Sequence, residues 1–190
     1  MKNIFSQVQM RKPGRNKFNL SHEKKLTCAM GNLVPIYLQE VVPGDSFRVR
    51  SEILVRFQAL IAPIMHRIDV TTHYYFVPNR LVWDNWEEFI TGGEDGMANP
   101  TAPFYPMSDA LKDFFNEQEL SDYFGIPTMP QAGAILSSPN ISALPFRAYA
   151  LIYDEYYRDQ NLISAINPIK TDGDSSADVG SLTLRNRCWE

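Results

Sequence analysis

Two histidines in the middle of the chain are the first residues to test for metal binding. His66 and His73 lie seven positions apart in a segment with the alternating pattern of a strand. On a continuous strand, side chains an odd number of residues apart point to opposite faces. A metal ion needs its ligands on one side, so this spacing argues against a shared site, and the sequence predicts neither a metal nor another cofactor.

Three carboxylates are close enough in sequence to act as acid and base. Asp84, Glu87 and Glu88 would lie on one face of a short helix, opposite a stripe that includes Trp83 and Trp86. Acidic residues near a helix start also interact favourably with the helix dipole, and Asp84 is placed to cap the helix. A solvated helical face therefore explains these carboxylates without catalysis.

No nucleophile in the sequence has the neighbours that covalent catalysis requires. The chain has no Gly-x-Ser-x-Gly motif, and Cys28 has only His22 nearby. The pair Gly92 and Gly93 lacks the lysine and hydroxyl residue of a phosphate-binding loop. Cys28 and Cys188 are 160 positions apart, which indicates free thiols in a reducing compartment, with a structural disulfide as the alternative. The sequence therefore predicts that the protein is not an enzyme.

The distribution of charge points instead to the binding of a polyanion. Residues 1–25 have a net charge of +6, whereas the remaining 165 residues carry −10. Such an arm can neutralise phosphates without reading their sequence, and a merely solvated tail is the alternative. Arginines also alternate along residues 47–61, where a wet strand face or a salt-bridged subunit contact would explain them as well. The candidate nucleic-acid-binding residues are Lys2, Arg11, Lys12, Arg15, Lys17, Lys24, Lys25, Arg48, Arg50 and Arg56.

Alternating apolar and polar residues predict strands in the first half of the chain. Residues 47–61 have apolar side chains at most odd positions and polar ones at most even positions. Residues 34–42 are a second strand candidate, and turn residues at 43–46 predict a hairpin between the two. A third alternation covers residues 68–76. The first half is therefore expected to be mainly antiparallel β structure.

The strongest predicted helix lies in the second half, at residues 146–159. Ala148, Leu151, Ile152 and Tyr156 would form its apolar face, which needs a sheet or another neighbour to cover it. Asp154 and Arg158, four residues apart, would pair on its outer side.

The segments around this helix are shorter or irregular. Glycine and proline residues predict a surface loop at 91–108, and 125–145 is a second irregular stretch. Short helices are expected at 109–115 and 119–124. Residues 167–180, rich in Asp, Ser and Gly, are expected to form a mobile loop before a further strand begins at 181–185.

An aromatic run joins the two halves of the chain. Residues 74–89 read Tyr-Tyr-Phe-Val-Pro-Asn-Arg-Leu-Val-Trp-Asp-Asn-Trp-Glu-Glu-Phe. The pattern predicts a strand that ends at Pro78, a tight turn, and an amphipathic helix after Arg80. Aromatic side chains are enriched in cores and where subunits meet, and they can also stack on unpaired bases. The candidate packing or subunit-interface residues are Tyr74, Tyr75, Phe76, Trp83, Trp86, Phe89, Phe146, Tyr149, Tyr153, Tyr156 and Tyr157.

Four blocks of the sequence, taken in order, resemble one viral family. They are Phe-Asn-Leu-Ser-His-Glu at 18–23, the Leu-Val-Pro-Ile start and Pro-Gly-Asp-Ser-Phe turn within 33–49, the aromatic run at 74–89, and Leu-Pro-Phe-Arg-Ala-Tyr-Ala-Leu-Ile-Tyr-Asp-Glu-Tyr-Tyr-Arg-Asp-Gln-Asn-Leu at 144–162. Together these blocks resemble the major capsid proteins of microviruses, the small icosahedral single-stranded DNA bacteriophages, and among them the gokushovirus group.

The resemblance implies both a fold and a function. Similar proteins build a T=1 icosahedral shell from copies of a viral jelly-roll β-barrel, in which two four-stranded sheets pack face to face and carry inserted loops and helices. The expected fold class is therefore mainly β with inserted helices. The implied partners are further copies of the chain and a circular single-stranded DNA genome. Minor virion and scaffolding proteins are left open as partners, and no membrane is expected.

The resemblance also implies a division of the chain. Family members are several times longer, so these residues correspond to about their first third and form only part of the barrel. We expect an N-terminal fragment with a basic arm at 1–32, the first jelly-roll strands and a helix start at 33–90, inserted loops and helices at 91–180, and a truncated strand at 181–190. Its expected location is the virion, and the host bacterial cytoplasm during assembly.

Two other classes remain open from the residues alone. A non-viral β-rich module that binds polyanions or glycans would explain the arginine-bearing strand and the aromatic residues. An enzyme would need a site assembled from Asp84, Glu87 and one of the histidines His66 and His73. No apolar stretch approaches the roughly 20 residues that span a bilayer, and the N-terminus is polar and basic where a signal peptide is apolar.

Overall fold

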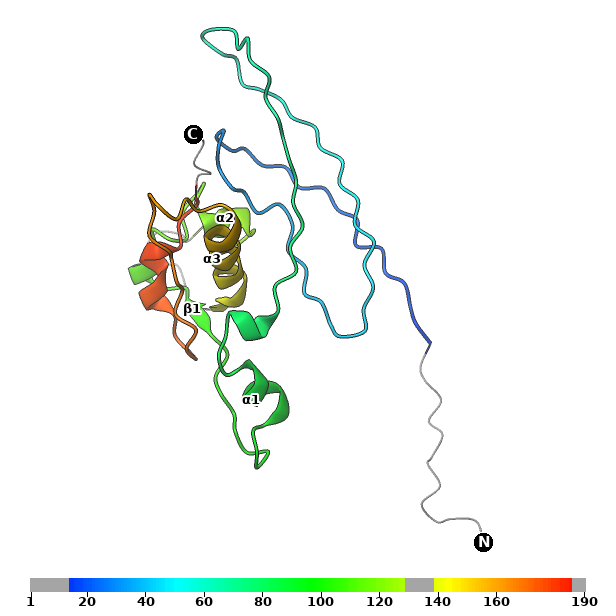
Figure 1. Cartoon of the computed structure of the whole chain (residues 1–190), viewed down its shortest axis with the longest axis vertical. Coiled ribbons are helices and arrows are strands. Elements are labelled where there is room, and N and C mark those ends of the chain that lie inside the picture. Colours follow the sequence, from blue (N-terminus) through cyan, green and yellow to red (C-terminus); the bar gives the residue numbers. More distant parts are fainter. Residues whose placement is uncertain (1–13, 129–138, 186–190) are drawn as a thin grey trace.

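The computed structural model describes residues 14–128 and 139–185, in two regions of different character. Residues 79–185, the helical region, hold the helices and strands, whereas residues 14–77, the extended region, run as long stretches of chain beside them (Figure 1). The elements are η1 (Asn79–Leu81), α1 (Trp86–Thr91), β1 (Phe104–Pro106), η2 (Asp109–Leu111), α2 (Leu120–Tyr123), β2 (Asn140–Ser142), α3 (Leu144–Tyr156) and η3 (Ser176–Ser181).

Helix α3 is the centre of the helical region. Pro145 lies in its first turn, where a missing N–H costs nothing because that group has no partner within the helix. The helix buries Phe146, Tyr149, Ala150 and Tyr153, which recur at helical intervals. The helix predicted at 146–159 is therefore confirmed, with its start two residues earlier and its end three residues earlier.

The apolar face predicted for this helix is wrong. Ala148, Leu151 and Ile152 are only half-buried, and Tyr156 is exposed. Apolar residues lie on nearly every side of α3, so the spacing alone does not select the face that is buried. The face with the larger aromatic rings is buried because those rings remove the most apolar area from water.

Asp154 and Arg158 organise the chain that leaves α3. Their side chains pair at 3.6 Å and are largely buried, so the predicted ion pair forms but not on the outer side. Asp154 also accepts hydrogen bonds from the backbone N–H groups of Ile166 and Asn167, at 3.0 and 3.1 Å. Arg158 donates to the carbonyl of Ile163 at 2.8 Å. The pair therefore fixes the loop after the helix.

A small sheet and two short helices pack against α3. Strands β1 and β2 are antiparallel, with Tyr105 opposite Ile141. Tyr105 is fully buried, and its ring lies 5.4 Å from that of Phe146. The helices η2 and α2 lie within the two short helices predicted at 109–115 and 119–124, which are thus confirmed in shortened form. The core consists of Tyr105, Met107, Leu111, Phe114, Phe115, Leu120, Ala143, Phe146, Tyr149, Ala150 and Leu182.

Several segments that were expected to be irregular contain regular structure. Strand β1 lies in the segment 91–108, and β2 and the start of α3 lie in 125–145. The mobile loop predicted at 167–180 is wrong for the same reason, since Phe104 exchanges backbone hydrogen bonds with Gly173 and Ser175, both at 2.9 Å. Asp and Ser side chains in this segment bond to the backbone and to other side chains, which orders it although it has few apolar residues.

The strand predicted at 181–185 is also wrong in this structure. The helix η3 continues to Ser181, and Leu182 is buried in the core. No described strand lies alongside these residues as a ladder partner. A short apolar alternation can place one residue in a core without forming a strand, and Leu182 does so here.

The three strands predicted in the first half do not form a sheet in this structure. The runs 34–42, 47–61 and 68–76 pass out and back in succession, but the described residues 14–77 contain no assigned strand (Figure 1). The turn predicted at 43–46 is confirmed, because the N–H of Asp45 donates to the carbonyl of Val42 at 3.0 Å. Strands with one apolar face need a second layer to cover it. The described residues supply no such layer, and the jelly roll is not confirmed by this structure.

Candidate functional site

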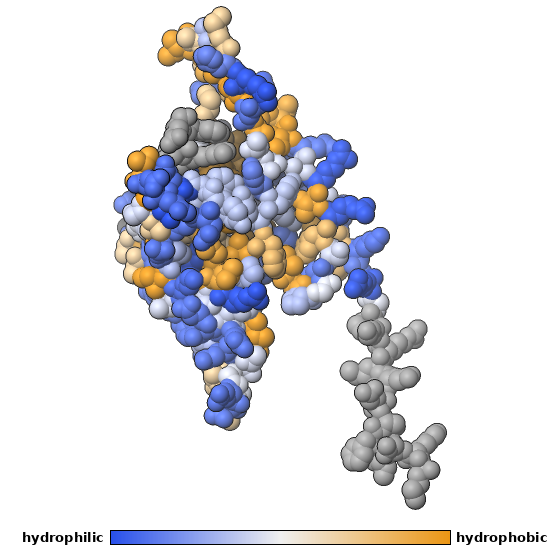
Figure 2. Space-filling view, viewed as in Figure 1, coloured by the Kyte–Doolittle hydropathy of each residue, from blue (hydrophilic) through white to orange (hydrophobic). Residues whose placement is uncertain are grey.

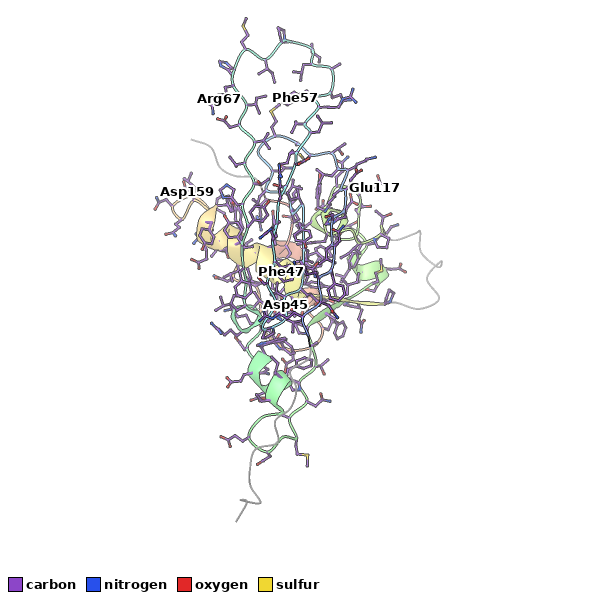
Figure 3. All side chains as sticks on the ribbon, turned by 90° about the vertical axis from the view of Figure 1, so that its right-hand side faces the viewer. Asp45, Phe47, Phe57, Arg67, Glu117 and Asp159 are labelled. Carbon is purple, nitrogen blue, oxygen red and sulfur yellow. The ribbon has the colours of Figure 1, made fainter. Side chains whose placement is uncertain are left out.

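The extended region exposes apolar side chains along most of its length. Figure 2 shows hydrophobic surface on the segments that project from the helical region. Phe47, Val49, Ile53, Val55 and Phe57, which we call the odd-numbered face, are between 42 % and 54 % exposed. Figure 3 places Phe47 and Phe57 at separate points along this run, so the face is long. Soluble proteins rarely leave a contiguous apolar surface of this kind uncovered, and such a surface indicates an interaction site.

The arginines on the alternate positions of the same run are all accessible. Arg48, Arg50 and Arg56 are exposed. Arg50 lies 3.6 Å from Glu52, and because both side chains are solvated this pair contributes little to stability. Among the described residues, no hydrogen bond or ion pair joins these arginines to the basic arm. The structure thus leaves Arg48 and Arg56 accessible to a polyanion or a neighbouring subunit, while Arg50 is paired with Glu52.

The basic arm is only partly within the described residues. Lys2, Arg11 and Lys12 lie outside them. Arg15, Lys17 and Lys25 are exposed.

Lys24 differs from the rest of the arm because it is anchored to the helical region. Its ammonium donates to the carbonyl of Pro35 at 3.2 Å and to the carbonyl of Tyr123 at the end of α2. Partial burial lowers the pKa of Lys24, and the nearby carboxylate of Asp122 opposes this shift. The hydroxyl of Tyr123 also donates to the carbonyl of Thr27 at 2.7 Å. The arm is therefore fixed from residue 24 onward.

Four of the candidate aromatic residues serve the core of this chain. Trp83, Phe146, Tyr149 and Tyr153 are all at most 6 % exposed. The hydroxyl of Tyr149 donates to the carbonyl of Leu33 at 2.9 Å, which ties the extended region to α3 at this residue. Burial raises the pKa of Tyr149 to about 12. These four are packing residues within the subunit and are not available for contacts between subunits.

The turn and helix predicted after Pro78 are confirmed as η1 and α1. The ring of Trp83 lies 5.8 Å from that of Trp86 and 5.0 Å from that of Phe89. Trp86 is half-buried, and Phe89 is 45 % exposed. This aromatic stripe therefore runs from the buried Trp83, through the half-buried Trp86, to the exposed Phe89.

A second aromatic group joins the run 68–76 to the end of α3. The hydroxyl groups of Tyr75 and Tyr157 are 2.8 Å apart, and the ring of Tyr75 lies 4.9 Å from that of Tyr156. Tyr74 and Phe76, on the other side of the run, are exposed. The hydroxyl of Tyr74 donates to the hydroxyl of Ser51 at 2.8 Å, which brings the runs 47–61 and 68–76 together at this point. Tyr74, Phe76 and the exposed Tyr156 remain available for subunit contacts.

The most buried charged residue, Arg147, was not found by sequence reasoning. Its guanidinium is fully buried and donates to the carbonyls of Val82 and Thr171, at 3.1–3.2 Å, and to the hydroxyl of Ser175 at 2.8 Å. Asp178 lies 3.8 Å away as its counter-ion. Arg147 thus connects α3 to the η1 turn and to the segment 171–178.

Burial shifts the pKa of both members of this pair. Desolvation lowers the pKa of Arg147, opposed by Tyr105 and Asp178. Desolvation raises the pKa of Asp178, opposed by the N–H of Ile169 and by Arg147. The available sequence signal was an arginine inside the most apolar helix, since buried arginines almost always have paired partners. Nothing in the local spacing identified those partners.

The residues considered for chemistry are not assembled into a site. Asp84, Glu87 and Glu88 are exposed, and the residue that caps α1 is Asn85, so the cap predicted at Asp84 is wrong. His66 is exposed, and the exposed His73 lies against the rings of Tyr75 and Tyr157. Within residues 14–128 and 139–185, no three His, Cys, Asp or Glu residues are grouped to hold a metal ion.

Two further sequence predictions concern the cysteines and the membrane. Cys28 is exposed and free, while Cys188 lies outside the described residues. No described helix has the length and apolar character to cross a bilayer.

Comparison with known proteins identifies the family. Residues 6–188 match the family described as Capsid protein (F protein). The capsid protein VP1 of Chlamydia phage 1 is 41 % identical over 183 residues, which cover 94 % of this chain and 30 % of that protein. VP1 of Bdellovibrio phage phiMH2K is 39 % identical over 175 residues, covering 92 % of this chain and 32 % of that protein.

A more distant relative agrees with these two. VP1 of Spiroplasma virus 4 is 33 % identical over 150 residues, covering 79 % of this chain and 26 % of that protein. The chain therefore spans about 30 % of the length of the curated relatives it matches. The resemblance drawn from the four sequence blocks is confirmed, and the chain belongs to the capsid protein (F protein) family.

Proposed function

We propose that this chain is part of a major coat protein that assembles with copies of itself into a small icosahedral T=1 shell around a circular single-stranded DNA genome. The observation that carries the proposal is the odd-numbered face, an alternating apolar surface whose side chains remain about half exposed. A face of this kind becomes stable when a second layer buries it, at roughly 25 cal/mol per Å² of apolar area. Because the chain belongs to the capsid protein (F protein) family, the protein that requires this second layer is a capsid protein.

The layer that covers this face is proposed to be the rest of a jelly-roll barrel. The matched relatives are more than three times as long as the aligned segment, which leaves ample chain for further strands. The three runs of the extended region already lie out and back in the order that an antiparallel sheet needs. The helical region is then an insertion that is held to the barrel at Leu33 and Tyr75.

The DNA-contacting part is proposed to be the basic arm together with the strand arginines. Arg15, Lys17 and Lys25 are exposed, and Arg48 and Arg56 form no ion pair among the described residues. Single-stranded DNA is a polyanion that such residues can hold through its phosphates alone. The protein would be located in the virion, and in the host bacterial cytoplasm before assembly. Contacts with minor virion or scaffolding proteins form part of the same proposal.

Alternatives to a coat protein have little support. A non-viral β-rich module for polyanions or glycans is not supported by the family relationship, which extends over almost the whole chain. Catalysis forms no part of the proposal, because membership of a structural capsid family gives no reason to expect it.

The test compares substitutions on the two faces of the run 47–61. Val55→Asn places a polar group on the odd-numbered face of the complete coat protein, and Gln58→Asn is the matched control at an exposed even position. We expect the control to give normal particle yields. The double variant Val49→Asn and Val55→Asn should reduce the yield strongly, because each valine that is buried in the particle contributes about 1.5–3 kcal/mol of burial free energy. Equal particle yields from the two variants would contradict the proposal.

A further inference from the structure

An open pocket lies where the basic arm meets the end of α2. Its volume is about 320 Å³, at the lower end of the range that is usual for small-molecule sites. The arm contributes His22 and Lys24, the run 34–42 contributes Pro35 and Tyr37, and the end of α2 contributes Tyr123 and Phe124. None of these residues takes part in the Arg147 network.

Two walls of the pocket are aromatic. The rings of His22 and Tyr37 are stacked at 5.4 Å with planes 26° apart. Phe124 is the second aromatic part of the lining, and its ring lies 4.9 Å from that of Phe146 and 6.5 Å from that of Tyr149. A flat ring that enters the pocket would therefore meet one adaptable aromatic pair and one aromatic residue fixed by the core.

The polar groups of the pocket are of mixed type. Two of the three donor positions on the Lys24 ammonium are taken by the carbonyls of Pro35 and Tyr123. The third donor is left for an acceptor, and each carbonyl has a second lone pair for a donor. The pocket can thus satisfy a ligand that carries both acceptors and donors on one edge.

The charge balance selects a neutral ring over a phosphate. The carboxylate of Asp122 is close enough to Lys24 to affect its pKa, so the negative charge there opposes a second anion. We infer that this pocket binds an unpaired nucleobase of single-stranded DNA against the aromatic rings of its lining, with the base edge on Lys24 and the two carbonyls. The DNA strand that carries the base continues along the arm, on which Arg15, Lys17 and Lys25 are exposed. This inference rests on the proposed DNA-binding function and names a base-specific part of it.

The experiment uses the full chain and two short DNA probes of equal length and charge. One probe is a deoxycytidine 12-mer, and the other is an abasic 12-mer with the same phosphates. We expect the wild type to bind the base-bearing probe more tightly. Tyr37→Ala and His22→Ala should each reduce this preference by about 5- to 150-fold per stacked base while leaving the affinity for the abasic probe unchanged. Phe57→Ala, an exposed aromatic far along the extended region, is the matched control.

Two further variants protect the result against loss of folding. Tyr37→Phe and His22→Phe keep an aromatic ring and should retain the preference for the base-bearing probe, and circular dichroism checks that every variant is folded. Equal affinity of the wild type for both probes, with the salt dependence of a phosphate-binding arm retained, would overturn the pocket and leave the coat function in place. Failure to bind either probe would overturn both the pocket and the proposed contact with DNA.

Discussion

The indole Nε1 of Trp83 donates a hydrogen bond to Oδ1 of Asp172, 89 positions further along the chain. The second oxygen of Asp172 accepts from the amide of Asn85 at 2.8 Å. One carboxylate thus joins the turn before α1 to the segment before η3. Arg147 connects the same two segments through the carbonyls of Val82 and Thr171. These polar contacts of Asp172 and Arg147 hold the helical region together in addition to its aromatic core.

Replacement of Trp83 tests how much its burial and its hydrogen bond to Asp172 stabilise the helical region. Trp83→Ala should lower the free energy of unfolding by about 3–5 kcal/mol, because it opens a cavity and removes the donor to Asp172. Phe89→Ala, on the same stripe but 45 % exposed, is the control and should cost much less. Urea denaturation of the full chain measures both. Similar losses of unfolding free energy in the two variants would show that Trp83 does not stabilise the helical region in this way.

Replacement of Arg147 tests the buried charge. Arg147→Met should cost about 3–5 kcal/mol, because it leaves Asp178 buried without its counter-ion and two carbonyls without a donor. Adding Asp178→Asn should recover part of this loss, since the uncompensated charge is then absent. A double-mutant cycle from urea denaturation gives the coupling. Losses that simply add would contradict the pairing seen at 3.8 Å.

Stability at alkaline pH should depend on Tyr149. In the unfolded chain this hydroxyl ionises near pH 10, whereas burial raises its folded pKa to about 12. The folded state therefore keeps the proton longer, and its stability is complete below pH 10 and falls as the pH rises toward 12. The fall attributable to this group is about 1.4 kcal/mol per pH unit.

Tyr149→Phe isolates this effect from the ionisation of the other tyrosines. The variant should be less stable at pH 8, because the bonds to Leu33 and Arg185 are lost, but should lose less further stability between pH 10 and 12. Unfolding midpoints in urea at several pH values give the comparison. Parallel curves for the wild type and the variant would contradict the assigned pKa.

Neutralising the exposed basic residues of the arm should weaken the binding of DNA without affecting the fold. The triple change of Arg15, Lys17 and Lys25 to Gln should flatten the slope of log K against log salt by about 2, since each contact with single-stranded DNA contributes about 0.7. Lys112→Gln and Lys170→Gln, exposed lysines of the helical region, are the matched controls. A slope unchanged by the triple variant would show that the arm does not contact phosphates.

The sequence predicted the elements whose pattern is local. The long helix at α3, the turn at 43–46 and the turn and helix after Pro78 were all found from spacing and turn residues. The buried face of α3 was not found, because apolar residues on several sides of that helix leave the choice to tertiary packing.

The site could be predicted only in outline. Sequence separated the basic arm from the acidic remainder, but it gave no sign that Lys24 is fixed by Tyr123 across 99 positions. It also treated the segment 167–180 as mobile, because its order comes from the contacts of Asp172 with Trp83 and of Asp178 with Arg147 and not from apolar periodicity. Long-range polar contacts leave no period in a sequence, which is why these were missed.

Hydrogen exchange of the backbone amides of residues 47–61 tests the coat-protein account most directly. The measurement compares the isolated 190-residue chain with nuclease-resistant particles of the complete coat protein. We predict rapid exchange in the isolated chain, where these amides have no ladder partners, and strong protection in the particles, where the odd-numbered face is buried in a completed sheet. Equally rapid exchange in the particles would contradict the account.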